Sequence, residues 1–176
     1  MDTHRLDHLI DHPAGHCLPG MRFGLAGLSL RLAALRQSVE RDYPLALAVD
    51  IVNRDAVDGL PPELTDTLHA LLEEAVLNAA RHGHAALAQL HVQVNGGMVL
   101  LSVADDGKGL PFICTYDLSA LTALGAGPRR LMDRVTALGG SLTLDSRMTG
   151  TRIDIALPRD GTLHPPETAS AHIVAA

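Results

Sequence analysis

Residues 74–82 read EAVLNAARH and lie near the end of a helix that the sequence predicts over residues 61–82. Pro61 and Pro62 suit its first turn, and Gly83 stops it. Its buried stripe consists of aliphatic and small residues, namely Leu68, Leu71, Leu72, Ala75 and Ala79. The helical period aligns polar residues along another face, namely Glu74, Asn78, Arg81 and His82. A carboxylate, an amide and a cation in one row suit a hydrated cation and phosphate oxygens, and the alternative is an ordinary solvated helix face.

A second polar motif directly follows a predicted strand. Residues 98–104 return from a hairpin turn at residues 95–97, and the chain continues as Asp105-Asp106-Gly107-Lys108-Gly109. Two glycines spaced two apart let the backbone approach a flat or charged ligand. A carboxylate at the end of a buried strand accepts a hydrogen bond from an exocyclic amine. The alternative is a plain acidic turn.

A third motif precedes a predicted helix that begins at Pro128 and ends at residues 139–140. Glycines at 125 and 127 before a helix N-terminus suit a phosphate, because free N–H groups and the positive end of the helix dipole point toward it. Basic residues follow within two turns, namely Arg129, Arg130 and Arg134. The alternative is a helix preceded by a flexible loop. Gly150-Thr151, at the start of the last strand, is weak alone.

The order of the remaining elements defines the fold class. The sequence predicts a helix over residues 21–41 and strands over residues 45–52, 89–94, 98–104, 141–145 and 151–157. Strands and helices in this order predict a two-layer α/β sandwich, with helices on one face of a mixed sheet. Residues 111–126 have no regular apolar period, so we expect a mobile segment there.

The composition excludes several functional classes. Of 176 residues, 47% are hydrophobic and only 2% aromatic, which predicts an aliphatic core and no stacking platform for single-stranded nucleic acid. A net charge of −6 disfavours a binder of the nucleic-acid backbone. Two cysteines are too few for a disulfide scaffold. No apolar run has the length that a membrane helix needs, so we expect no direct membrane insertion and a cytoplasmic location.

The N-terminal helix carries a narrow apolar stripe, at Leu25, Leu28, Leu32, Leu35 and Val39. This stripe either packs on its own domain or pairs two copies of the chain as a homodimer through residues 21–41. We therefore divide the chain into an N-terminal segment at 1–42, a main domain at 43–158 and a flexible tail at 159–176.

Together the motifs resemble the ATP-binding catalytic domain of histidine kinases, in the superfamily that also holds gyrase, Hsp90 and MutL and is known as the Bergerat fold. Residues 74–82 look like its N-box, residues 105–109 like its first glycine box, and residues 125–134 like its second. Residues 137–142 and 150–151 also fit. The nitrate-sensor and DesK-like subfamily is the most similar, and the resemblance covers residues 45–158.

The resemblance implies a role for each matching residue. Asp105 would bind the adenine amino group, with Thr151 helping through a water, and Gly107 and Gly109 would let the nucleotide lie against the loop that also holds Lys108. Asn78 would ligate Mg²⁺, and Arg81 or His82 would meet phosphate oxygens. Lys108 and Arg134 would also bind the nucleotide. Gly125 and Gly127 would hinge an ATP lid at residues 110–127. Glu74 matches the residue that activates water in ATPase members, and in kinases it more often acts at the metal and phosphate end.

Two features depart from the family. Pro128 stands where the subfamily usually has Leu. The proline ring fixes φ at the start of the helix. The histidines ahead of residue 45 are His4, His8, His12 and His16, and none begins the His-Asp or His-Glu pair of a phosphoacceptor. The resemblance therefore implies either the catalytic part of a longer kinase or a stand-alone member that acts on a partner. Its partners would be a phosphoacceptor and dimerisation domain and a response regulator. The alternatives are a serine kinase like the anti-sigma factors of the superfamily, and a nucleotide-binding module without turnover.

Overall fold

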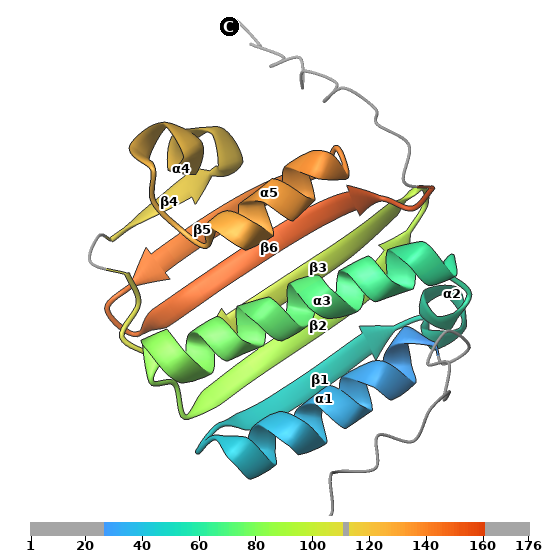
Figure 1. The fold of residues 1–176 in the computed structure, drawn as a ribbon, viewed down its shortest axis with the longest axis horizontal. Coiled ribbons are helices and arrows are strands. Elements are labelled where there is room, and N and C mark those ends of the chain that lie inside the picture. Colours follow the sequence, from blue (N-terminus) through green and yellow to red (C-terminus); the bar gives the residue numbers. More distant parts are fainter. Residues whose placement is uncertain (1–26, 111–112, 161–176) are drawn as a thin grey trace, which may run out of the picture.

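The structure, a computed structural model, describes residues 27–110 and 113–160. Its sheet has six strands in the order β1-β2-β3-β6-β5-β4 (Figure 1). The strands are β1 (Ala46–Val52), β2 (Leu87–Asn95), β3 (Met98–Asp105), β4 (Cys114–Asp117), β5 (Ser141–Arg147) and β6 (Gly150–Pro158). β1 and β2 run parallel, and every other neighbouring pair runs antiparallel. The sheet is therefore mixed, as the sequence predicts.

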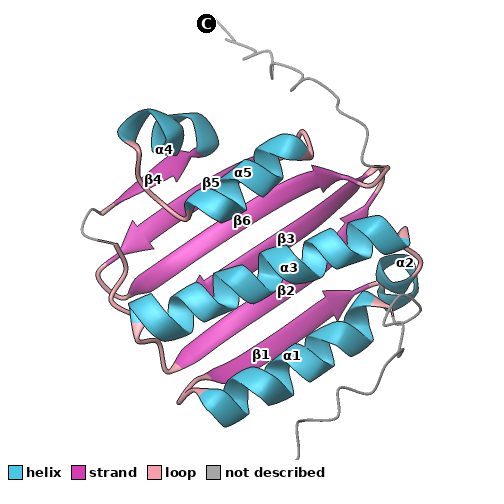
Figure 2. Cartoon of the chain, viewed as in Figure 1, coloured by secondary structure: helices cyan, strands magenta, loops and turns pink. Residues whose placement is uncertain are grey.

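Helices cover one face of this sheet, which confirms the predicted two-layer α/β sandwich (Figure 2). They are α1 (Leu28–Asp42), α2 (Arg54–Asp58), α3 (Pro62–Asn78), α4 (Leu118–Leu124) and α5 (Arg129–Ala137), with a π-helical turn η2 (Ala79–Gly83) after α3. The core between the layers is almost entirely aliphatic, as the composition predicts. None of the helices within the described ranges has both the length and the apolarity that crossing a bilayer needs.

Helix α1 packs on the same sheet as α3. Four residues of its predicted stripe are buried in the common core, namely Leu28, Leu32, Leu35 and Val39. The first six residues of the predicted helix, 21–26, lie outside the described part of the chain, and Leu25 of the stripe is one of them. Asp58 accepts hydrogen bonds from the backbone and hydroxyl of Ser29, at 2.8 and 2.6 Å, which anchors the first turn of α1. Of the two interpretations of the stripe, packing within the chain is the one observed.

The segment at 111–126, which the sequence predicts to be mobile from its lack of an apolar period, contains a strand and a helix. β4 pairs with β5, and α4 follows it directly. The Asp117 side chain caps α4 by accepting from the Ala120 amide at 2.7 Å, and Leu121 is fully buried. Both elements are too short for a periodic pattern, so only the cap marks them in the sequence. Residues 111–112 lie outside the description.

The helix predicted over residues 61–82 also differs in its last turn. The α-helical hydrogen bonding of α3 ends at Asn78 and continues as η2. A π-helical turn is a rare local widening that is frequent at functional sites. It changes the direction of Arg81 and His82 relative to the straight row of the sequence argument. Helix α2, directly after β1, is a further element that the sequence analysis did not predict.

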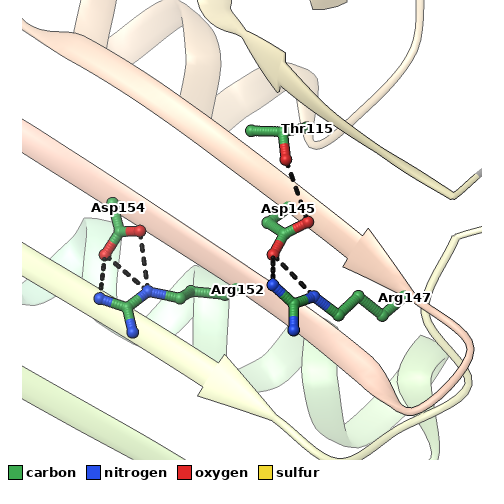
Figure 3. Close-up of polar contacts among 5 residues, drawn as sticks. All are labelled: Thr115, Asp145, Arg147, Arg152 and Asp154. Atoms are coloured by element: carbon green, nitrogen blue, oxygen red, sulfur yellow. Dashed lines mark hydrogen bonds and ion pairs between the residues drawn. The ribbon is translucent and has the colours of Figure 1, made fainter.

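The face of the sheet away from the helices carries ion pairs along single strands (Figure 3). On β6, Arg152 makes a two-pronged contact with Asp154, at 2.8 to 3.1 Å. On β5, Arg147 pairs with Asp145, which also accepts from the Thr115 hydroxyl at 3.2 Å. Residues two apart on a strand share a face, which brings each pair together.

Candidate nucleotide site

A cavity of about 550 Å³, here the main cavity, lies between α3, η2 and the ends of β3 and β6. Many of the residues singled out in the sequence line it, namely Asn78, His82, Asp105, Lys108, Gly109, Gly127 and Thr151. Its apolar wall comes from Ala75, Ala79, Leu144 and Ile153. An apolar wall with a few convergent polar groups suits a flat, partly apolar ligand.

Asp105 is the last residue of β3, and two backbone amides hold its carboxylate. Oδ1 accepts from the amide of Gly107 at 2.8 Å and from that of Thr151 at 3.3 Å. The pairing of Ala104 with Arg152 places the start of β6 beside the end of β3. Burial raises the pKa of the Asp105 carboxyl above its ordinary value of 3.8, and the two amides oppose this shift. Since both bonds fall on Oδ1, Oδ2 is left for a ligand, as judged within the described residues.

Two glycines allow a close backbone approach at this end of the cavity. A Cβ at Gly150 would lie 1.8 Å from the carbonyl oxygen of Asp105, and one at Gly109 would lie 2.0 Å from that of Arg147. Their φ values are +135° and +68°, which disfavour a residue with a side chain. Loop 105–110 therefore packs directly against the turn between β5 and β6. Gly109 has this packing role in addition to the ligand contact that the sequence suggested.

The same loop is braced against the segment after η2, a contact that sequence reasoning missed. Oδ1 of Asp106 accepts from the amides of Ala86 and Leu87, both at 2.8 Å. The amide of Lys108 donates to the Gly83 carbonyl at 2.9 Å. Asp106 was the only sign of this contact in the sequence, and we treated Asp105 and Asp106 together as one motif. The brace connects loop 105–110 to the helix that carries Asn78.

A second, open cavity of about 430 Å³, here the side cavity, lies beside the C-terminal half of α3, between this helix and α5. It is lined largely by charged and polar residues, namely Glu73, Glu74, Asn78, Arg81, His82, Arg130 and Arg134. Nη1 of Arg134 lies 3.5 Å from Oε2 of Glu74, which joins α5 to α3. Asn78 and His82 line both cavities, so the two adjoin at the end of α3.

Some predicted site residues lie elsewhere. Gly125 ends α4 with a φ of +61°, and its carbonyl accepts from Arg129 at 3.1 Å. It lines a separate, small cavity beside α4. Gly107 is buried against Gly83 rather than lining the main cavity. Arg81 reaches the side cavity only, because its guanidinium is held by Tyr43. The structure thus brings most of the predicted set together around the two cavities, whereas Gly107 and Gly125 line neither of them.

Comparison with known families decides what kind of site this is. Residues 63–161, more than half of the chain, match the family described as Histidine kinase-, DNA gyrase B-, and HSP90-like ATPase. The chain belongs to this family. Every site residue named above, from Glu74 to Thr151, lies within the matched range.

Its relatives among characterised proteins are sensor kinases. The chain is 25% identical over 140 residues to the sensor histidine kinase YxjM of Bacillus subtilis, covering 79% of this chain and 32% of YxjM. It is 32% identical over 93 residues to the signal transduction histidine-protein kinase/phosphatase UhpB of Salmonella typhimurium, covering 53% of this chain and 17% of UhpB. The chain thus spans about a third or less of the length of these relatives.

Solved structures agree on the fold. The histidine kinase domain of the blue-light activated histidine kinase EL346 from Erythrobacter litoralis superposes with a TM-score of 0.58 at 23% identity. The match covers 76% of this chain and 59% of that one. At this identity the likeness establishes the shared architecture of the ATPase-family domain.

A magnesium ion fits the donors of this ATPase-family domain. Within the described ranges no cluster of three or more His, Cys, Asp or Glu residues could hold a metal by itself. The side cavity nevertheless offers the Asn78 amide and, four residues earlier on the same helix, the Glu74 carboxylate. Mg²⁺ prefers oxygen ligands, keeps several waters and takes its remaining ligands from substrate phosphates. One amide oxygen with a nearby carboxylate suits that chemistry.

Proposed function

We propose that this ATPase-family domain is the catalytic domain of a two-component sensor histidine kinase. It would transfer the γ-phosphoryl group of ATP to a phosphoacceptor histidine on a separate domain. One observation carries the proposal: two adjoining cavities connect a half-buried carboxylate at the end of a strand, Asp105, to the polar row of α3. The family match, together with relatives that are sensor histidine kinases, supports this choice among the ATPases of the family.

At the Asp105 end, we propose that Oδ2 accepts a hydrogen bond from the adenine amino group. The backbone amide of Thr151 supports this contact by donating a hydrogen bond to Oδ1. The Thr151 hydroxyl would also help, through a water that it binds. Lys108 and Gly109 line the cavity beside the ring, and Gly107 lets the loop turn closely past Gly83. Ala75, Ala79 and Ile153 supply apolar contacts to the ring faces.

At the Glu74 end, we propose that the side chains of α3, η2 and α5 handle the phosphates. Asn78 would hold Mg²⁺, which when bound offsets the negative charge of the phosphates. Arg81, His82 and Arg134 donate to phosphate oxygens, and Gly127 lies where the lid joins α5. Gly125 would act as the other lid hinge, at the end of α4. Glu74 orients Arg134 and the metal-bound end for the transfer.

The transfer itself needs little from the protein beyond positioning and charge. A ring nitrogen of the acceptor histidine attacks the γ-phosphorus, and the bond from that phosphorus to the β–γ bridging oxygen breaks. ADP leaves with the electron pair of that bond, and the imidazole loses its proton. Holding the two reactants in line supplies most of the rate.

The partners follow from this function. We propose a phosphoacceptor and dimerisation domain, then a response regulator, with the work carried out in the cytoplasm where ATP is available. Residues 43–158 form the nucleotide-binding unit, between an N-terminal segment at 1–42 and a tail at 159–176. Pairing of two copies through residues 21–41 would use the exposed face of α1, since the stripe on its other face is buried in the chain.

The test is incubation of the chain with γ-labelled ATP and Mg²⁺, alone and with the phosphoacceptor domain of a related histidine kinase. We expect acid-labile, base-stable label on the acceptor, as a phosphohistidine gives. A variant of the acceptor with its histidine replaced by Gln is the control and should remain unlabelled. Acid-stable label on a protein partner would indicate a serine kinase, and absence of nucleotide binding would overturn the proposal.

A further inference from the structure

Arg81 is held from outside the nucleotide-binding elements. Its Nε donates to the hydroxyl of Tyr43 at 2.8 Å, and its guanidinium carbon lies 5.7 Å from the centre of the Tyr43 ring. Both a hydrogen bond and a cation–π contact therefore fix one edge of the guanidinium. The two residues are 38 positions apart in the chain.

Tyr43 is itself fixed by helix α1. It is the residue that ends α1, its amide donates to the carbonyl of Val39 at 2.9 Å, and its ring packs against the core. Val39 belongs to α1 and is buried in the core. The position of the Tyr43 hydroxyl is thus set by the end of α1 rather than by a mobile loop.

The contact with Tyr43 engages Nε of Arg81 and leaves its two terminal NH₂ groups, which are the groups that bind an anion. Nε is engaged, but neither terminal nitrogen has a hydrogen-bond partner within residues 27–110 and 113–160. Arg81 lines the side cavity together with Asn78 and His82. An exposed arginine otherwise samples many rotamers, and holding it costs conformational entropy when a ligand binds. A guanidinium already held at one edge presents its two NH₂ groups with less of that cost.

We propose that Tyr43 is a positioning residue for the phosphate end of the nucleotide site, acting through Arg81. The inference rests on the proposed function, because it assigns the side cavity to phosphates. It also connects the end of α1 to the site: a shift of α1 moves the Tyr43 hydroxyl and with it the guanidinium.

The test compares ligands with and without phosphates on the full chain. Tyr43→Phe keeps the ring and removes the hydroxyl. We expect its affinity for Mg-ADP, measured by calorimetry, to fall about threefold to tenfold, the range of one hydrogen bond. Affinity for adenosine, measured by displacement of a fluorescent nucleotide, should stay the same. Ser38→Ala is the matched control, since it also removes one hydroxyl near the end of α1, and it should leave both affinities unchanged.

A double-variant cycle tests the route through Arg81. Arg81→Gln should weaken ADP but not adenosine, and adding Tyr43→Phe to it should have no further effect. Unchanged or tighter ADP binding by Tyr43→Phe overturns the inference and leaves the proposed function standing. An equal loss for adenosine, or additive losses in the cycle, also overturns it, because Tyr43 would then act on the fold as a whole. If the unaltered chain binds no ADP, the proposed function falls and the inference falls with it.

Discussion

The two ends of the nucleotide cavity are built in different ways. At the Asp105 end, backbone groups of loop 105–110, β6 and the segment after η2 hold one another at contact distance. At the Glu74 end, side chains make the contacts: Glu74 of α3 lies 3.5 Å from Arg134 of α5, and Arg81 of η2 is held by Tyr43. Backbone packing therefore fixes the first end, whereas contacts between side chains hold the second. Stability variants should therefore act at the first end, and rate variants at the second.

The largest expected effect comes from breaking the backbone approach at the Asp105 end. In Gly150→Ala the new Cβ would lie 1.8 Å from the Asp105 carbonyl oxygen, so the two strand ends must separate. We expect a loss of about 2–4 kcal/mol in the free energy of unfolding, measured by urea denaturation.

Gly97→Ala is the control for this variant, because nothing lies within 4 Å of its Cβ position. It should change the free energy of unfolding by less than about 0.5 kcal/mol. Equal midpoints for the two variants would show that the strand ends are not tightly apposed.

Asp105→Asn separates ligand recognition from folding. The amide oxygen can still accept from the amides of Gly107 and Thr151, so the fold should stay intact. Its NH₂ group would face the adenine amine, donor against donor. We expect affinity for ADP to fall about 5-fold to 150-fold, from a loss on the order of 1–3 kcal/mol. Calorimetric titration measures this.

The neighbouring carboxylate provides the control. In Asp106→Asn the amide oxygen can accept from the amides of Ala86 and Leu87, and the residue does not line the main cavity. ADP affinity should stay close to that of the unaltered chain. If Asp105→Asn also binds ADP normally, Asp105 does not recognise adenine.

As the pH is lowered, ADP binding should begin to weaken at a higher pH than it would with an aspartate of ordinary pKa. Burial raises the pKa of Asp105, and the ionised carboxylate accepts from the adenine amine more strongly than the protonated acid, whose O–H is a donor. Affinity should therefore fall as pH drops through this raised pKa, and Asp105→Asn should flatten that part of the profile.

The sign for stability is the opposite. Between the ordinary and the raised pKa, the folded chain binds more protons at Asp105 than the unfolded chain does. This group's contribution to stability therefore decreases as pH rises through that window. Parallel unfolding curves over the acidic range distinguish the two effects. A pH profile of ADP affinity identical in the parent and the Asn variant would contradict this assignment.

The smallest effect on affinity is expected at Glu74. Glu74→Gln should leave ADP binding within about a few-fold, because Gln can still contact Arg134, yet slow phosphoryl transfer by about 100-fold. Measuring both ADP affinity and the rate of phosphoryl transfer sharpens the contrast between the Asp105 end and the Glu74 end. Glu63→Gln is the control, since it removes the same charge from the first turn of the same helix. Transfer at the parental rate by Glu74→Gln would show that this carboxylate takes no part in it.

Local patterns in the sequence were sufficient for much of this architecture. Hairpin turns, prolines at helix starts and the period of α3 each depend on neighbours in the chain, so the sandwich was predictable from them. That Asn78, Asp105 and Thr151 share one site came from the resemblance to the family. The end of β3 meets the start of β6 because antiparallel neighbours bring those ends together.

The missed features depend on contacts between distant residues. Tyr43 meets Arg81 only once α1 and α3 have packed side by side, and Asp106 meets Ala86 only across the folded loop. The π-helical turn has no periodic signature, and β4 with α4 is too short to show one. These features need the tertiary structure to be seen.

The ion pairs on the open face of the sheet affect how a nucleotide arrives. Arg152 and Arg147 each lie about 3 Å from a carboxylate on the same strand. Opposite charges so close together appear neutral from beyond a Debye length, roughly 8 Å at physiological salt. An approaching nucleotide therefore experiences little field from these two pairs. On the helix side, Arg130 and Arg134 of α5 border the side cavity, and we expect a higher ionic strength to slow association there.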